Sequence, residues 1–389
     1  MSASPGQDCQ QAPALARVAR EWGRIGTIGF GGPPVHIALL RELCVARERW
    51  LSEAQFERAL AAVNMLPGPA STQLAIYCAW RLRATRGALV GGVSFILPGL
   101  LAIIALSALF LAGSPPVWLR AAGRGAGSAV AAVALSAGLA IAAPIWRRTA
   151  AERRARIALY GLIGAAAAAS AGPWLVLALL ACGAAELLRH RLERGGLRLH
   201  AWFGPLALAK AGSTGALVWT ALKVGALAFG GGFVIVPLMQ SDAVGTYHWM
   251  THAQFLNAVA LGQVTPGPVT QTVAAVGYAA GGVPAALLAA LVAFAPSFSF
   301  ILIGASRFEA LLRDERVNAF LVGAAPAAAG AIIGAAVPLT LALTEDWQYA
   351  VLALAALALL VLRRGVVVTL LGAGVLGTVV ALLGGPVPR

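Results

Sequence analysis

Residues 30–69 read FGGPPVHIALLRELCVARERWLSEAQFERALAAVNMLPGP, and residues 229–268 read FGGGFVIVPLMQSDAVGTYHWMTHAQFLNAVALGQVTPGP. The two stretches align without a gap, and 15 of the 40 aligned pairs are identical. After one deleted residue the repeat continues and pairs Pro98 with Pro296. The chain therefore contains two copies of one segment, and glycine and proline interrupt both copies at the same places.

The composition places the chain in a lipid bilayer. Hydrophobic residues make up 59% of the sequence and charged residues only 11%, whereas a soluble protein has about 25% charged residues. Apolar halves that glycine and proline break at corresponding positions are typical of secondary transporters, and the breaks point to the substrate site. We therefore expect an all-helical polytopic membrane protein built from two repeats.

Charge and cysteine content exclude other classes. The net charge of +14 could suggest nucleic acid, but the arginines lie in short clusters between apolar runs, where cytoplasmic loops carry them. The cysteines, Cys9, Cys44, Cys78 and Cys182, have neither CxxC nor paired spacing, which argues against a disulfide framework or a metal site. The sequence has no GxxxxGK(S/T) motif for ATP. We expect no nucleic-acid partner, no cofactor and no metal.

Apolar runs define the domain organisation. In the first half they cover residues 25–43, 54–83, 88–113, 125–146 and 157–188. In the second half they cover residues 217–240, 254–281, 283–304, 318–343, 347–362 and 366–385. The expected parts are an N-terminal segment that could form an interfacial helix (1–24), a first transporter repeat (25–188), a basic cytoplasmic linker (189–213) and a second transporter repeat (214–389).

The arginine distribution predicts that the two halves are inserted in opposite orientations. Arginine clusters follow the runs 54–83 and 125–146, whereas the equivalent places in the second half are uncharged at 279–283 and acidic at Glu345-Asp346. Lysine and arginine concentrate in cytoplasmic loops. We expect two inverted-topology repeats of about five transmembrane helices each, plus a re-entrant broken-helix hairpin per repeat, with the N-terminus outside.

The interrupted run at 54–83 has arginines on both flanks, so we expect it to enter and leave the membrane by the same face. Each arm of about 13 residues, at a rise of 1.5 Å per residue, reaches about 20 Å, which places Pro67-Gly68-Pro69 near mid-membrane. Non-helical backbone at that depth must face protein or a watery cavity. The hairpin is therefore expected to line the interior.

Both Pro-Gly-Pro breaks precede hydroxyl residues, a pattern that starts a helix and offers N–H groups to an anion. Arg24 and Lys223 are equivalent cations near the glycine breaks, and no carboxylate lies at the equivalent depth in both halves. This pattern predicts a site for a small anion between the halves, in a cationic cavity suited to a dianion, and no catalytic residues. The expected substrate-binding residues are Arg24, Gly31, Gly32, Asn64, Gly68, Ser71, Thr72, Gln73, Lys223, Gly230, Gly231, Gln263, Gly267, Thr270, Gln271 and Thr272.

Several of these residues also have a simpler interpretation. The glycine breaks could serve close helix packing, and Arg24 and Lys223 could extend their charged ends to the membrane interface. His36 has Ile235 as its counterpart, which favours a core or surface histidine over a proton carrier.

The combined motifs resemble the chromate ion transporter family in its long, two-domain form, over nearly the whole chain. The motifs are Phe30-Gly31-Gly32-Pro33 with His36, Trp50-Leu51 before Gln55-Phe56, Asn64 before Pro67-Gly68-Pro69, and Phe229-Gly230-Gly231-Gly232 with Pro266-Gly267-Pro268. A modest departure is Gly232, which stands where the first half has Pro33.

The resemblance implies a multi-pass inner-membrane transporter that exports chromate and confers chromate resistance, with sulfate competing for the pathway or sharing it. We expect alternating access by rocking of one repeat against the other, and chromate, sulfate and the lipid bilayer as partners; a homodimer is compatible with the sequence. One alternative is a transporter of sulfate or another tetrahedral oxyanion. The other is a membrane-bound reductase, which no clustering of histidine, cysteine or carboxylates supports.

Overall fold

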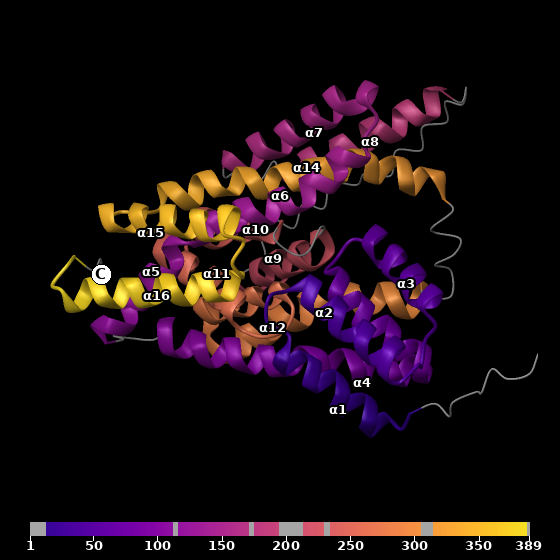
Figure 1. Cartoon of the computed structure of the whole chain (residues 1–389), viewed down its shortest axis with the longest axis horizontal. Helices are drawn as coiled ribbons and strands as arrows, with labels where there is room; N and C mark the ends of the chain where they lie inside the picture. The colour runs from indigo at the N-terminus through magenta and orange to yellow at the C-terminus, as the bar shows by residue number, and fades with distance from the viewer. Residues whose placement is uncertain are drawn as a thin grey trace, which may run out of the picture.

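The computed structural model describes residues 13–111, 116–170, 175–193, 213–228, 234–304 and 314–386, and these residues form helices and no strands (Figure 1). The first half contains α1 (Leu15–Ile28), α2 (Pro33–Arg41), η1 (Glu42–Arg47), α3 (Glu53–Met65), α4 (Ala70–Leu111), α5 (Val117–Ser128), α6 (Val130–Arg148), α7 (Ala151–Ala169) and α8 (Leu175–Glu193). The second half contains α9 (Ser213–Leu227), α10 (Ile235–Gln240), η2 (Ser241–Thr246), α11 (His252–Val264), η3 (Val269–Gln271), α12 (Thr272–Gly304), α14 (Glu315–Leu341), α15 (Asp346–Ala356), η5 (Leu357–Val361) and α16 (Val366–Leu382).

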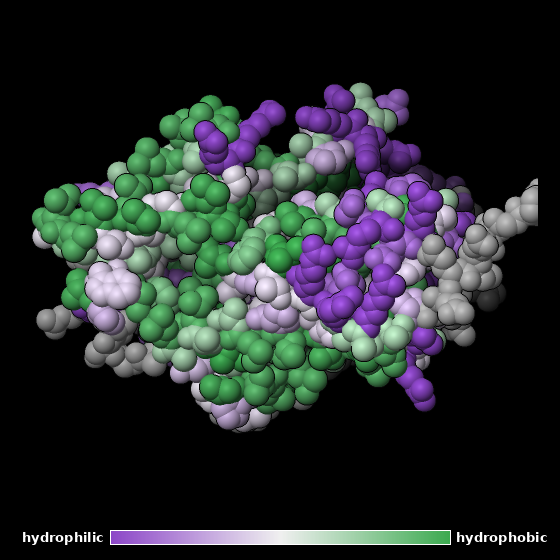
Figure 2. Space-filling model, turned by 60° about the horizontal axis from the view of Figure 1, so that its bottom comes forward, coloured by the Kyte–Doolittle hydropathy of each residue, from purple (hydrophilic) through white to green (hydrophobic). Residues whose placement is uncertain are grey.

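Within the described ranges, four apolar helical stretches are long enough to cross a membrane: α4, the continuous α5–α6, η3–α12 and α14. Large hydrophobic side chains on these helices, such as Leu101, Leu291 and Ile303, are exposed. Figure 2 shows a broad apolar surface, with hydrophilic residues gathered mainly toward the end where α1 to α3 lie. Exposure of so much apolar surface to water is energetically unfavourable, and the long apolar helices have the length of a membrane crossing. The chain is therefore a multi-pass membrane protein.

Two of the long helices are each divided by a sharp kink. Arg83 and Ala84 interrupt α4, and Gly281 and Gly282 interrupt α12; Ala84 and Gly282 have positive φ values of 47° and 69°. The first part of α4 pairs with α3 to form the first hairpin, and the first part of α12 pairs with α11 to form the second hairpin. These are the helical arms that the sequence predicts on either side of each Pro-Gly-Pro break.

The expected crossing over residues 25–43 is wrong, because this stretch is a helix pair that folds back on itself. Arg17 near the start of α1 pairs with Glu48 just after η1 at 2.6 Å, so both ends of the stretch lie at the same end of the molecule. The chain reverses where Gly31 and Gly32 adopt φ values of 102° and 76°, and Pro33 starts a new helix. The start of α1 therefore lies at the same end of the molecule as the arginines that follow η1, which we call the arginine-bearing end. The sequence predicts the N-terminus at the opposite end.

Helices at the end of each half pack on helices of the other half. In the first half, α7 and α8 pack on α14 of the second half, while α15 and α16 pack on α5 and α6. Glycine makes the approach close: a Cβ on Gly164 would clash with the Ala327 backbone, and one on Gly125 would clash with the Ala373 backbone. In Figure 1, α3 lies toward one end of the long axis, whereas α11 lies nearer the middle, where it packs on α5 and α16.

Candidate functional site

The two hairpins have the same local structure because they have the same local sequence. Ser52 begins α3 and Thr251 begins α11, each in a capping box with the glutamine three residues later. At the tips, Gly68 and Gly267 have φ values of 122° and 95°. Glycine adopts this left-handed region readily, whereas other residues rarely do, so each tip requires it.

A glutamine holds each tip in shape. Gln73 Nε2 donates to the carbonyl oxygen of Pro67 at 2.7 Å, and Gln271 Nε2 donates to that of Pro266 at 2.6 Å. The sequence assigned these amides to the substrate, but one N–H of each amide is bonded to its own tip. Each glutamine therefore links the start of the second arm to the break before it.

The two halves meet at these tips. The N–H of Gly267 donates to the carbonyl oxygen of Gly29, at the break between α1 and α2, at 3.1 Å. A Cβ on Gly68 would lie 3.4 Å from Ser297 Oγ of α12, and the equivalent position to Ser297 in the first half is Gly99, which packs against Gln271. Each tip thus contacts the long helix of the other half next to its proline, Pro98 or Pro296.

Buried polar atoms gather around both tips. Among the described residues, several side-chain atoms there are buried without a hydrogen-bond partner: Thr72 Oγ1, Gln73 Oε1, Gln263 Nε2, Thr270 Oγ1, Gln271 Oε1 and Ser297 Oγ. Thr72 and Thr270 are equivalent in the repeat, and both are fully buried. A buried polar group left unpaired costs about 1–3 kcal/mol. A polar ligand between the tips would remove this penalty, and a threonine hydroxyl can donate to an anion.

His36 belongs to this region, which the sequence did not indicate. It is fully buried, Nε2 donates to the carbonyl oxygen of Gly29 at 2.9 Å, and Nδ1 lies 3.4 Å from Ser71 Oγ. With Nε2 protonated, a neutral ring accepts at Nδ1, so the Ser71 hydroxyl donates to the histidine. The sequence signal was weak because the second half has Ile235 at this position.

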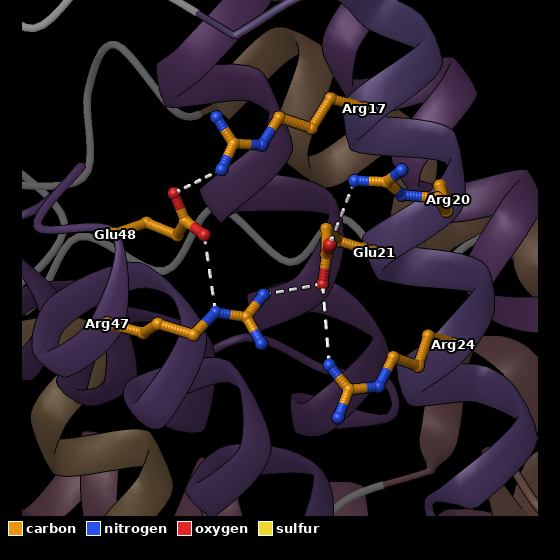
Figure 3. Close-up of polar contacts among 6 residues, drawn as sticks. All are labelled: Arg17, Arg20, Glu21, Arg24, Arg47 and Glu48. Atoms are coloured by element: carbon orange, nitrogen blue, oxygen red, sulfur yellow. Dashed lines mark hydrogen bonds and ion pairs between the residues drawn. The ribbon is translucent and has the colours of Figure 1, made fainter.

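The two predicted cations have different surroundings. Arg24 is 57% exposed and lies 3.8 Å from the Glu21 carboxylate (Figure 3), whereas Lys223 is 17% exposed and pairs with Asp242 at 2.5 Å. Thr220 Oγ1 also donates to Asp242, at 2.7 Å. Alignment of the halves did not reveal these carboxylates, because they occupy different positions on different helices. Lys223 is therefore paired with a buried carboxylate in this structure, whereas Arg24 is largely exposed.

The remaining predicted residues are divided between the tip region and the surface. Gly32 is buried and close to Val269 in η3, whereas Gly31 is exposed. Asn64 is exposed, but its equivalent Gln263 is buried. The Thr272 hydroxyl donates to the carbonyl oxygen of Val269 at 2.7 Å and closes the first turn of η3. Gly230 and Gly231 lie outside the described residues.

Two broken hairpins, each with its tip against the other half of an apolar helical protein, define a class, the polytopic membrane transport proteins. The sequence model of the family described as "Chromate transporter" matches residues 16–187 and 215–378. The chain belongs to the chromate transporter family, and it is a transport protein and not an enzyme. The reductase alternative is therefore excluded.

Curated relatives agree with this assignment. The chain is 31% identical to the chromate transport protein of Cupriavidus metallidurans, over 87% of this chain and 85% of the relative. It is 33% identical to that of Pseudomonas aeruginosa, over 80% and 77% of the two chains. It is 29% identical to a probable chromate transport protein of Synechococcus elongatus, over 84% and 85%. No solved structure matches the chain.

Proposed function

We propose that the protein is a secondary transporter that exports chromate across the inner membrane by alternating access and thereby confers chromate resistance. The observation that carries this proposal is the pair of equivalent buried hydroxyls, Thr72 and Thr270, which lack partners beside the two tips. The names of the relatives supply the chemistry of the substrate, a tetrahedral dianion.

The dianion would lie between the two hairpin tips. Helix α4 and the η3–α12 helix begin directly after the tips, so their first N–H groups and positive dipole ends are directed toward the same region. The hydroxyls of Thr72 and Thr270 would donate to the oxyanion, and Gln73 and Gln271 would keep the tips in place. Arg24 would contribute positive potential, and Lys223 would do so when it leaves Asp242.

We further propose that the halves are inverted-topology repeats that exchange roles during transport. The reversed arginine bias of the two halves supports this. The equivalents also differ in exposure, since Asn64 and Arg24 are exposed while Gln263 and Lys223 are not. Such a difference is expected when one side of the site is more open than the other. In the opposite state, the second half would adopt the arrangement of the first.

The membrane potential alone would supply a substantial driving force for export. Movement of two negative charges across 100 mV is worth about 4.6 kcal/mol, twice the value for one charge. A dianion leaving a negative cell interior moves down this gradient. The proposal therefore needs no ATP, in agreement with the missing nucleotide motif.

Flux into inside-out membrane vesicles tests the proposal. Labelled chromate should accumulate when the vesicle lumen is made positive, and the rate should fall when the potential is collapsed. Added sulfate should compete, because the two dianions have similar size and charge. Uptake of labelled sulfate but not of chromate would establish the alternative, a transporter for sulfate. Absence of both fluxes would reject oxyanion transport.

A further inference from the structure

Charged residues gather where α1 starts and η1 ends. We call them the arginine cluster, which consists of Arg17, Arg20, Glu21, Arg24, Arg47 and Glu48 (Figure 3). Ion pairs of 2.6 Å join Arg17 to Glu48 and Arg47 to Glu21. Four arginines and two glutamates give the cluster a net charge of +2.

The excess charge lies on the outward side of the cluster. Arg20 and Arg24 lie 3.6 Å and 3.8 Å from the Glu21 carboxylate, and 75% and 57% of their side chains are exposed. Glu21 already accepts a 2.6 Å hydrogen bond from Arg47. The weaker contacts of Arg20 and Arg24 leave both guanidinium groups able to attract an anion.

These arginines form part of a continuous exposed line on α1. Arg17, Arg20, Arg24 and Thr27 follow one another at intervals of three or four residues, and all four are exposed; Gly31, in the break after α1, is exposed as well. This spacing places successive residues on one helix face. The line therefore runs from the first turn of α1 to the break between α1 and α2. At this break Gly29 accepts the hydrogen bond from Gly267 of the second tip.

A neighbouring hairpin arm also exposes polar residues. On α3, Arg58 and Asn64 are exposed, and Asn64 lies three residues before the first tip; the exposed Glu53 and Glu57 pair with Arg41 of α2. An arginine deep in the hydrocarbon region of a membrane costs about 2.5–3.5 kcal/mol on insertion scales. An aqueous vestibule open to the arginine-bearing end accounts for both polar faces without this cost.

The second half has no corresponding line. The residues of α9 equivalent to Arg17, Arg20, Arg24 and Thr27 are Ala216, Trp219, Lys223 and Ala226. Lys223, the only cation in that set, is neutralised by Asp242 at 2.5 Å. The two equivalent places in the halves therefore differ in net charge, with +2 at the arginine cluster and zero at the Lys223–Asp242 pair.

From this difference we infer that the exposed face of α1 is an aqueous entrance that loads the oxyanion from the arginine-bearing side. The inference rests on the proposed function for the identity of the anion. A positive surface beside a low-dielectric wall raises the local anion concentration and the association rate. The apparent KM measured from the arginine-bearing side should therefore be lower than the KM measured from the opposite side.

Thiol labelling tests the entrance without relying on transport. In a chain whose four cysteines are replaced by alanine, Thr27→Cys should react with membrane-impermeant methanethiosulfonates added on the arginine-bearing side. A sulfonate-bearing reagent should react faster than a trimethylammonium-bearing one, relative to their rates with free thiol, and Arg20→Gln/Arg24→Gln should remove this preference. The matched variant Ala226→Cys on α9 should show no anion preference. An unreactive Thr27→Cys, or one without an anion preference, would overturn the inference.

Flux measurements test the sidedness. Arg20→Gln/Arg24→Gln should raise the KM for chromate about tenfold from the arginine-bearing side, with little change in maximal rate, and the effect should vanish at high salt. Arg148→Gln, which removes an exposed arginine at the end of α6, is the control and should change neither value. Equal KM changes from both sides would place these arginines in the central site, and no change would leave them as interface anchors; either result refutes the entrance. Failure of the wild type to move chromate would instead reject the proposed function, while the labelling result would stand.

Discussion

The backbone N–H of Gly267 donates a 3.1 Å hydrogen bond to the carbonyl oxygen of Gly29, so the tip of the second hairpin is bonded to the helix break of the first half. The same oxygen accepts from His36 at 2.9 Å. Neither break can move away from the other without losing this bond. If the halves rock against each other as proposed, this hydrogen bond is present in one transport state and broken in the other.

Valine at either tip glycine should abolish transport. Gly68 and Gly267 have φ values of 122° and 95°, and a β-branched side chain cannot adopt this conformation without strain. Chromate flux into vesicles, normalised to the amount of protein in the membrane, measures the effect. Gly372→Val on α16 is the control, because a Cβ there meets open space. Transport by Gly267→Val at the wild-type rate would show that the second tip is scaffold.

Thr72→Val and Thr270→Val should weaken substrate binding without lowering stability. Both hydroxyls are buried and unpaired, so valine of similar shape removes a polar group that has no partner to lose. If each hydroxyl donates to the dianion, its loss costs about 1.5–3 kcal/mol, or about ten- to a hundredfold in KM. The melting temperature in detergent should stay equal or rise.

The control for these threonines is Thr378→Val, which removes a hydroxyl bonded within α16 to the carbonyl oxygen of Gly374. That variant should leave the KM unchanged. A wild-type KM in both Thr72→Val and Thr270→Val would exclude their hydroxyls from the substrate site.

His36→Leu should lower both stability and transport, because it removes the contacts with Gly29 and Ser71 that hold the break to the first tip. Loss of these bonds is expected to cost about 1–3 kcal/mol. His36→Gln, which can retain one of the bonds, should recover part of both properties. Thermal unfolding and initial flux measure the two effects, with His252→Ala on exposed α11 surface as the control. Equal behaviour of His36→Leu and wild type would assign the ring to packing alone.

The Lys223–Asp242 pair should show strong coupling in a double-mutant cycle. Lys223→Gln leaves the Asp242 carboxylate buried with Thr220 as its remaining partner, and Asp242→Asn leaves a buried ammonium group. Each single variant should be destabilised by about 3–5 kcal/mol, the penalty for an uncompensated buried charge. The double variant should recover its melting temperature but not its chromate affinity, because Lys223 is absent. Additive effects of the two substitutions would show that the pair does not interact.

The proposed inversion of the halves predicts opposite accessibility for two exposed turn residues. Arg153→Cys at the start of α7 and Asp346→Cys at the start of α15, each in a cysteine-free chain, should react with an impermeant thiol reagent from opposite sides of the membrane. Right-side-out and inside-out vesicles provide the comparison. Labelling from the same side would reject the inverted repeat.

The hairpin arms could be predicted from sequence because their signals are local. The apolar runs over 54–83 and 254–281 predict the helical arms, and Pro67-Gly68-Pro69 and its counterpart mark the breaks, so α3 and α11 follow from hydropathy and proline chemistry. The reversal between α1 and α2 could not be predicted in the same way. A 19-residue apolar run over 25–43 has the length of a membrane crossing, and composition does not reveal that Gly31 and Gly32 turn the chain back.

Sequence comparison of the halves also could not find contacts that break the repeat. His36 beside the first tip and Asp242, the partner of Lys223, are buried polar residues, but their equivalents are Ile235 and Leu43, so a search for matched residues passes over them. The packing of helices of one half on helices of the other could not be predicted either, because α7 and α14 are far apart in the sequence and come into contact only in the tertiary fold. The predicted residues that directly follow the tips, such as Thr72 and Thr270, are buried in both halves. Other predicted pairs, such as Asn64 and Gln263, differ in exposure between the halves.

The glycine contact between Gly164 and the Ala327 backbone has a consequence for biosynthesis. A ribosome adding about 5–20 residues per second needs roughly 10–30 s to make the chain between these two positions. During that interval α7 has been made but its packing partner α14 has not, so its glycine-lined face lacks the helix that covers it in the finished fold. Packing of the first half is therefore completed only when α14, near the end of the chain, has been synthesised.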